Sequence, residues 1–110
     1  MSYKKHLIVE NSSVTSALEM LNTLSSDAII FVVDLNNKLI GSLTDGDLRR
    51  GFLKSLDFNN SLLEFLQPQP KYIYQNEISR SIIEKYSKLG FKILPLINDE
   101  KIVIDVINIQ

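Results

Sequence analysis

The sequence contains no cysteine, which excludes disulfides, zinc sites built on thiolates and a cysteine nucleophile. His6 is the only histidine, so we expect neither a histidine-rich metal site nor a conventional catalytic triad. Its position between Lys5 and Leu7 predicts a solvated side chain near a flexible N-terminus. No apolar run reaches the roughly 18–20 residues that a membrane-spanning helix needs. The first ten residues are too polar for a signal peptide.

The sequence also has no large excess of positive or negative charge: it contains 12 Lys+Arg and 13 Asp+Glu, a formal net charge of −1. This balance argues against nucleic acid or a membrane surface as a partner held by bulk electrostatics. The 110 residues are 45% hydrophobic, which fits one compact domain or two small motifs that share a core. We therefore expect a soluble, cytoplasmic protein.

In the first half, the spacing of apolar residues predicts a helix over residues 13–24, with Ser12 or Ser13 as its N-cap. The apolar run 28–33 is typical of a buried strand, and the polar residues 34–38 are typical of a turn into a second strand, 39–43. A further helix is expected to start at Thr44 or Asp45.

Pro68 and Pro70 mark the clearest boundary in the chain, because they stop a short preceding helix over Leu62, Leu63 and Leu66. Beyond them the pattern predicts a short strand at 72–74, a helix and two more strands, 92–97 and 101–107. We expect Asn76 to cap the helix, Gly90 to end it in the left-handed conformation, and Pro95 to mark an unpaired side of its strand. The apolar stripe of the helix is predicted to be Ile78, Ile82, Tyr86 and Leu89.

The two halves form an internal repeat. The helix and first long strand recur after 64 residues, and the second long strand recurs after 63, as if one turn residue had been dropped. Neither β–α–β–β unit is large enough to bury its own sheet, so each is expected to stabilise the other. We predict an α+β fold of two motifs, 1–66 and 67–110, packed with pseudo-twofold symmetry.

One polar cluster does not repeat. Gly41, Thr44 and Asp47 align with Ile104, Ile107 and Gln110 at the 63-residue offset. Thr44 at a helix start suits a phosphate, Asp47 suits two vicinal hydroxyls, and Gly41 leaves room for a flat ligand close to the backbone. Gly46 adds space between Thr44 and Asp47. Ordinary helix capping also explains these residues and, from their spacing alone, is the favoured interpretation.

The stretch LIGSLTDGDLRR resembles the hallmark of the CBS-domain family, an apolar–Gly–x–x–Thr–x–x–Asp run at the end of the second main strand. With the proline boundary and the second unit that follow, nearly the whole chain is similar to a tandem pair of CBS motifs (a Bateman module), each β–α–β–β–α. The TDGDLRR variant is similar to CBS pairs attached to sugar-phosphate isomerases and to sugar-phosphate nucleotidyltransferases, where the pair precedes the catalytic domain.

The resemblance implies a regulatory module that senses AMP, ADP or ATP in the cleft between the motifs and modulates a catalytic domain in cis or in trans. The resemblance implies that Thr44 contacts phosphate or ribose and that Asp47 binds the ribose hydroxyls. Ser42 and Gly46 are expected to contribute mainly backbone contacts. The adenine is expected to lie against the second motif, opposite Thr44 and Asp47. Because the second motif has no Thr and Asp at the equivalent positions, at most one binding site is expected. The second motif also lacks the family's closing helix. The residues expected near the adenine are Lys71, Tyr72, Ile93 and Pro95.

Other interpretations of these residues remain open. Arg49 and Arg50 could reach a phosphate or form a solvated helix face, and Asp45 with Asp47 forms a D-x-D whose carboxylates diverge, which disfavours a metal ion. No acid–base or nucleophilic pair is apparent, so we expect neither a catalytic nor a metal site. The alternative function is a ligand-free structural module that forms a homodimer through its helices. Apolar residues expected to be exposed for such an interface are Leu62, Phe65 and Leu66.

Overall fold

The computed structural model describes residues 3–110, which form the predicted α+β fold of two halves with one three-stranded sheet each. Sheet order is β1-β2-β3 in the first half and β4-β5-β6 in the second. The strands are β1 Leu7–Val9, β2 Ile29–Val33, β3 Leu39–Thr44, β4 Ile73–Tyr74, β5 Ile93–Ile97 and β6 Val103–Asn108. The helices are α1 Val14–Leu24, α2 Asp45–Leu53 and α3 Arg80–Lys88, with 3₁₀ turns η1 Tyr3–His6, η2 Ser25–Asp27, η3 Leu62–Glu64 and η4 Gln75–Glu77.

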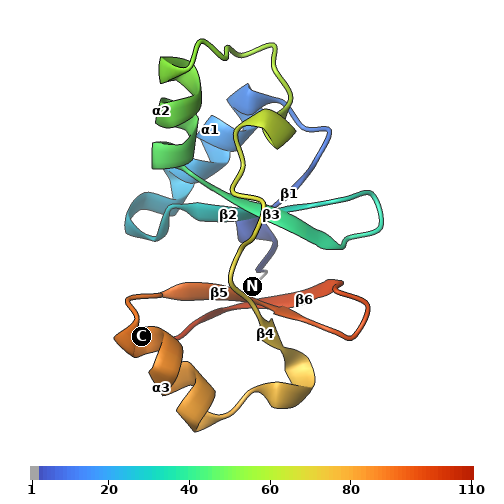
Figure 1. Ribbon diagram of the computed structural model, residues 1–110, viewed down its shortest axis with the longest axis vertical. Coiled ribbons are helices and arrows are strands. Elements are labelled where there is room, and N and C mark those ends of the chain that lie inside the picture. Colours follow the sequence, from blue (N-terminus) through green and yellow to red (C-terminus); the bar gives the residue numbers. More distant parts are fainter. Residues whose placement is uncertain (1–2) are drawn as a thin grey trace.

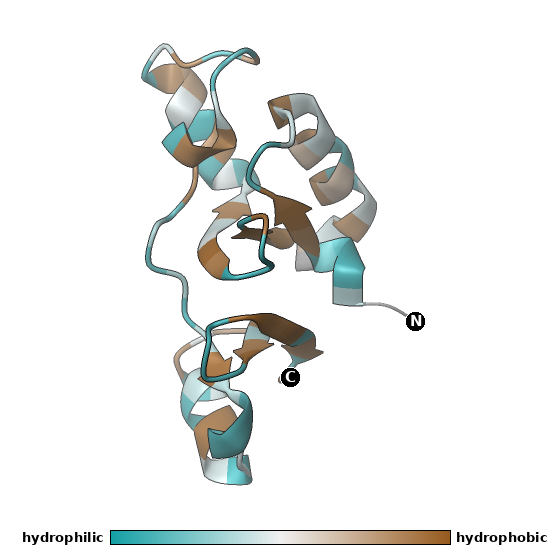
Figure 2. Cartoon of the chain, turned by 90° about the vertical axis from the view of Figure 1, so that its right-hand side faces the viewer, coloured by the Kyte–Doolittle hydropathy of each residue, from teal (hydrophilic) through white to brown (hydrophobic). Residues whose placement is uncertain are grey.

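The two sheets face each other across the middle of the molecule, and the helices cover their outer faces (Figure 1). Helices α1 and α2 lie over the first sheet, and α3 lies over the second. The strands of both halves are predominantly apolar (Figure 2). Val33, Ile97 and Val103 are buried together where the halves meet, so the halves share a core as the repeat predicts.

Strand pairing gives the repeat an almost symmetric register. Within each half the two long strands pair antiparallel and the short strand pairs parallel with the middle one. The hairpin turns of the two halves also meet: the Leu39 amide donates to the Lys101 carbonyl, and the Val103 amide donates to the Asn37 carbonyl, both at 3.0 Å. Each of these bonds is the counterpart of the other at an offset of 64 residues, as expected for a pseudo-twofold axis between the turns.

The register corrects the predicted offset of 63 for the second long strand. Ile29 pairs with Thr44 and Ile93 pairs with Asn108, so the offset is 64 in both long strands and no turn residue is lost. Both hairpins also carry an irregularity at the same point, before Val33 and before Ile97. The counterpart of Thr44 is therefore Asn108 rather than Ile107, and the position equivalent to Asp47 lies beyond Gln110.

Most local predictions are confirmed. Ser13 caps α1, Thr44 caps α2, and Gly90 has a left-handed φ of +96°. Strand β4 pairs only with Leu96 and Ile97, which leaves β5 without a partner on that side at Pro95. The cap predicted at Asn76 is wrong: Asn76 lies in a 3₁₀ turn, and the helix begins after a Ser79 cap.

The helical stripe predicted for α3 is also partly wrong. Ile78 precedes the helix and is 40% exposed, and Leu89 follows it and is 63% exposed. Ile82 and Tyr86, by contrast, pack against the core of the second half.

The N-terminal segment differs most from its prediction. His6 is 5% exposed, and its Nδ1 lies 2.8 Å from the Ile29 carbonyl oxygen, so it is a buried structural residue rather than a solvated one. This contact holds η1 against the start of β2. Residues 7–9 form the leading strand of the first β–α–β–β unit, which was predicted without a position, and they pair with Phe31, Val32 and Val33.

The segment between α2 and the proline boundary packs inward. Leu62 and Phe65 are buried in the core of the first half, which contradicts their predicted role on an exposed interface, and Leu66 packs partly buried against the same core. The reason lies in α2: a Cβ on Gly51 would stand 2.2 Å from the Phe65 ring. Gly51 therefore allows this segment to lie directly against the helix.

Candidate functional site

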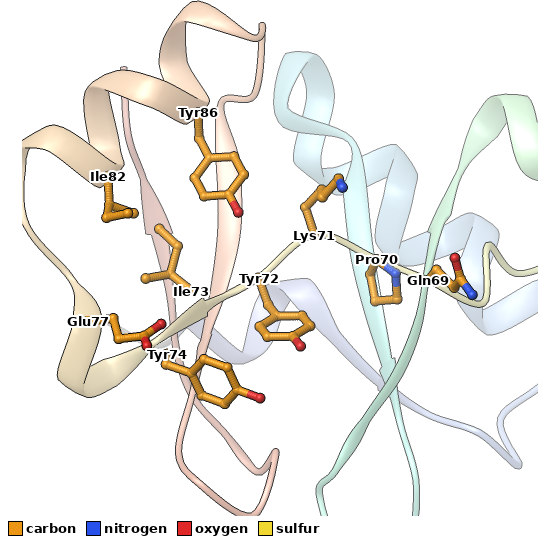
Figure 3. Close-up of a pocket in the computed structure, with 9 residues that line it drawn as sticks. All are labelled: Gln69, Pro70, Lys71, Tyr72, Ile73, Tyr74, Glu77, Ile82 and Tyr86. Carbon is orange, nitrogen blue, oxygen red and sulfur yellow. The ribbon is translucent and has the colours of Figure 1, made fainter.

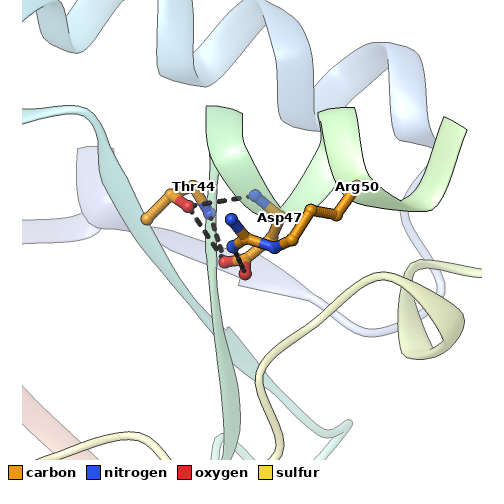
Figure 4. Close-up of polar contacts among 3 residues, drawn as sticks. All are labelled: Thr44, Asp47 and Arg50. Atoms are coloured by element: carbon orange, nitrogen blue, oxygen red, sulfur yellow. Dashed lines mark hydrogen bonds and ion pairs between the residues drawn. The ribbon is translucent and has the colours of Figure 1, made fainter. Parts of the chain in front are cut away.

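The polar cluster lies at the junction of β3 and α2, where Thr44 and Asp47 form a reciprocal capping box (Figure 4). The Asp47 amide donates to Thr44 Oγ1 at 3.2 Å, and the Thr44 amide donates to Asp47 Oδ2 at 2.9 Å. The Thr44 hydroxyl donates to the same carboxylate oxygen at 3.0 Å. The box satisfies amides that a helix N-terminus otherwise leaves unpaired.

Arg50 completes the cluster from the next turn of α2. Its Nη2 lies 2.7 Å from Asp47 Oδ1, an ion pair between residues i and i+3 of the helix. The Asp47 side chain is 10% exposed, whereas the Arg50 side chain is 64% exposed. A buried carboxylate is thus held at the helix start by the capping residue Thr44 and by an exposed arginine.

A cavity of about 230 Å³ lies beside this junction, between the two halves. Its residues form pairs 64 apart, such as Ala28 with Lys92 and Ile29 with Ile93, so the cavity straddles the pseudo-twofold axis. Thr44 is the direct sheet partner of Ile29, and Asn108 is that of Ile93. Thr44 and Asn108 therefore adjoin the cavity through their sheet partners, although neither residue lines it. It is lined by Ser26, Ala28, Ile29, Gly90, Phe91, Lys92 and Ile93.

The space expected at Gly41 is filled by the chain itself. A Cβ on Gly41 would stand 2.8 Å from a Leu66 methyl group and 2.9 Å from the Gln67 carbonyl oxygen. The neighbouring Ser42 exchanges both of its backbone hydrogen bonds with Gln67. Gly41 accommodates the segment that leads to the second half, so the prediction that it admits a flat ligand is wrong.

Lys71 and Tyr72 line other cavities than Ile93 does. Both contribute to a cavity of about 380 Å³ between β4 and α3 (Figure 3), and Tyr72 also lines one of about 280 Å³ beside β3. In Figure 3 the side chains of Lys71 and Tyr72 leave the chain on opposite sides, as in an extended strand. Pro95 is buried in the middle of β5 and lines none of these three cavities.

Tyr72 and Tyr74 pack edge to face, with ring centroids 5.3 Å apart. A hydrogen bond with Tyr72, and repulsion from the charge that Tyr72 acquires on ionisation, raise the pKa of Tyr74 above its ordinary value. The Tyr74 hydroxyl is therefore neutral near pH 7.

Two features of the site were not predicted from the sequence. The cavity wall of Ser26, Ala28 and Ile29 was not predicted, although antiparallel pairing of the predicted strands places the start of one opposite the end of the other. The pairing of Arg50 with Asp47 follows from their i, i+3 spacing, which makes the two side chains neighbours on a helix.

The second carboxylate of the D-x-D does not join the first. Asp45 is exposed, whereas Asp47 is turned into the capping box and the ion pair. Within residues 3–110 no group of three metal-ligating side chains comes together. In the same part of the chain, no helix is both long and apolar enough to cross a membrane.

Among known protein families, the model of the CBS domain matches residues 1–54, just under half of the chain. A Helicobacter pylori protein described as uncharacterized is 37% identical over 65 residues, 59% of this chain. The match spans only 20% of that protein, so the chain corresponds to a small part of its relative.

Solved structures share the fold over almost the whole chain. Staphylococcus aureus OpuCA is 22% identical, with a TM-score of 0.74 over 93% of this chain and 83% of its own. CBSX2 in complex with AMP is 21% identical, with a TM-score of 0.74 over 94% and 80%. The CBS domain pair of MJ0100, in complex with methylthioadenosine and S-adenosyl-L-methionine, is 20% identical, with a TM-score of 0.68 over 94% and 86%. The chain has the fold of a CBS-domain pair.

Proposed function

We propose that this chain, whose first half matches the CBS domain and whose fold is that of a CBS pair, is a non-catalytic regulatory module that binds an adenine nucleotide. The observation that carries the proposal is the junction of Thr44 and Asp47 beside a cavity between the halves. A carboxylate at a helix start can accept hydrogen bonds from ribose hydroxyls. The N-terminal amides of the same helix favour phosphate.

In this proposal AMP, ADP or ATP lies on the Thr44 flank of the 230 Å³ cavity, with its base against Ile29 and Ile93. Asp47 holds the ribose, and Thr44 and the backbone at Gly46 face the phosphate. The other flank carries Asn108 in place of Thr44, so we propose one site per chain. The bound AMP and S-adenosyl-L-methionine of two solved structures with this fold support an adenosine-containing ligand.

Calorimetric titration of AMP, ADP and ATP tests the proposal. We expect saturable binding of at least one nucleotide and its loss in Asp47→Asn, which retains an acceptor for the Thr44 amide but removes the charge. The matched control is Asp45→Asn, because Asp45 lies in the same helical turn but is exposed and outside the cluster. A folded protein that binds none of the three nucleotides contradicts the proposal.

The regulatory role follows from the position of the site between the motifs 1–66 and 67–110. A ligand that contacts both halves favours one relative packing, and a catalytic domain attached to the chain or bound to it would sense this as a shift in population. We propose a cytoplasmic sugar-phosphate nucleotidyltransferase as that enzyme, on the resemblance of the TDGDLRR stretch. The test is whether the nucleotide that binds here changes the turnover of the enzyme encoded with this module.

A second candidate function is a structural module that dimerises through its helices. Apolar side chains exposed at the ends of two helices favour it, namely Leu53 at 79% and Leu89 at 63%. Light scattering with and without nucleotide separates the two functions. A dimer unaffected by nucleotides, in a protein that binds none of them, would leave only the structural role.

A further inference from the structure

We infer that Arg50 competes with the ribose for Asp47 and thereby makes the site selective for phosphorylated nucleotides over the nucleoside. This inference rests on the proposed function. It starts from the number of hydrogen bonds that the Asp47 carboxylate can accept. A carboxylate offers about four acceptor positions, two on each oxygen.

Three of these positions are already taken. Oδ2 accepts from both the amide and the hydroxyl of Thr44, and Oδ1 accepts from Arg50. One position is left, whereas two vicinal hydroxyls need two. The two bonds to Thr44 belong to the helix cap, and breaking them would cost helix stability. The bond to Arg50 is the one that a ribose can replace without loss of the cap.

The Arg50 side chain is placed to leave Asp47 and to contact a phosphate instead. Its side chain is 64% exposed, so the guanidinium is free to move into solvent. It also lies close above the helix start, where a Cβ on Gly46 would stand 3.3 Å from Nη1 and 3.5 Å from Nη2. Gly46 therefore gives the guanidinium room beside Thr44. A phosphate bound at this helix start would offer Arg50 a new acceptor, and arginine pairs well with phosphate.

The consequence differs between ligands. A nucleoside displaces Arg50 from Asp47 but has no phosphate to offer Arg50 as a new acceptor, so the released guanidinium is left unpaired. A nucleotide displaces Arg50 and also provides the phosphate that rebinds it. Arg50 therefore weakens the binding of adenosine and strengthens that of AMP.

Arg49 provides a matched control, because it carries the same charge one residue away. It is exposed and lines the groove between α1 and α2 together with Leu18 and Phe52, whereas Arg50 pairs with Asp47. General attraction between the helix and an anionic ligand changes to the same extent in both variants. Only the Arg50 variant removes the competition for Asp47.

The experiment is calorimetric titration of adenosine and AMP into the whole chain and its Arg50→Gln and Arg49→Gln variants, with thermal melting to verify folding. In Arg50→Gln we expect adenosine to bind about 2- to 5-fold more tightly and AMP about 10-fold more weakly. Arg49→Gln should change both affinities less than about twofold, apart from a common effect on AMP at low salt.

If the unmodified protein binds AMP but Arg50→Gln shifts both ligands in the same direction, or neither, the role of Arg50 is refuted and the proposed function stands. If the unmodified protein binds neither adenosine nor AMP, the role of Arg50 is refuted, and the proposed function fails as well only if ADP and ATP do not bind either. Arg50→Lys refines the result, since it keeps the charge without the planar donor pair. Recovery of the AMP affinity by lysine with adenosine still bound tightly would support displacement of a specific guanidinium contact.

Discussion

At the scale of single residues, the same atoms serve the helix cap and the proposed site. Capping alone is a sufficient structural role for Thr44 and Asp47, because their capping box provides hydrogen-bond partners for two backbone amides at the start of α2. From its spacing alone the sequence favours capping over ligand binding, and the structure shows that the cap is formed. The contributions of these residues to helix capping and to ligand binding can therefore be separated only by substitutions that keep one of the two roles and remove the other.

Thr44→Ala is expected to lower the free energy of unfolding by about 0.5–2 kcal/mol, because the N-cap acceptor for the Asp47 amide is lost. Thr44→Ser keeps that acceptor and should stay within about 0.5 kcal/mol of the original protein. Urea unfolding measures both. Equal losses in the two variants would mean that the methyl group, rather than the cap, carries the effect.

His6→Ala should destabilise the protein by about 1–3 kcal/mol, because the partly buried Ile29 carbonyl loses its partner and the ring leaves a void. Lys5→Ala, next to it and exposed, is the control and should have little effect. Urea unfolding again provides the comparison. A stability unchanged by His6→Ala would place this histidine in solvent, as the sequence alone suggests.

At the scale of helices and strands, the sequence predicts most elements because the signals are local. The Ser13 and Thr44 caps, the polar turn at 34–38 and the left-handed Gly90 each follow from the chemistry of a few neighbouring residues. The start of α3 was misplaced because Asn76 and Ser79 are both good caps. The leading strand of the first unit was not located at Leu7–Val9 because three residues carry no periodicity, and pairing with β2 decides their conformation.

Packing between elements was beyond prediction for a similar reason. The burial of Leu62 and Phe65 depends on Gly51, which lies on a different helix and whose contact with Phe65 no local pattern reveals. The filling of the space at Gly41 by Leu66 and Gln67 is of the same kind. Both cases turn on a glycine whose missing Cβ admits another part of the chain.

Gly51→Ala tests this packing, because helix propensity and packing predict opposite signs. Alanine should stabilise the helix interior by about 1 kcal/mol, but here a Cβ meets the Phe65 ring, and we expect a net loss of about 1–3 kcal/mol. Combining it with Phe65→Leu should reduce that loss, giving a coupling energy in a double-mutant cycle. A stabilised Gly51→Ala would show that the segment is free to move away.

At the scale of the whole molecule, the repeat was recognised from sequence but its offset in the second long strand was wrong. The letters of the two turns align best with one residue dropped, whereas hydrogen bonding between the hairpins fixes equal lengths. The error changed the counterpart of Thr44 from Ile107 to Asn108. The two positions still differ, because Thr44 carries a hydroxyl that caps a helix, whereas Asn108 carries a side-chain amide.

Ile97→Ala is expected to cost about 2–5 kcal/mol, because Ile97 is fully buried where the two halves meet. The loss should appear in both halves at once, as one transition seen by far-ultraviolet dichroism and by tyrosine fluorescence. Leu35→Ala, which truncates a side chain that is 75% exposed, is the control. Two separated transitions would show that the halves are independent units.

The most direct test of the account is an amide NMR titration of the whole chain with AMP. We predict saturable shifts that concentrate at Ile29, at Thr44 to Asp47 and at Lys92 and Ile93, the two walls of the cavity and the helix start between the halves. The same residues should stay unshifted when AMP is added to Asp47→Asn. Shifts confined to the 380 Å³ cavity lined by Tyr74, Ile82 and Tyr86, or no shifts with millimolar AMP, ADP or ATP, would contradict it.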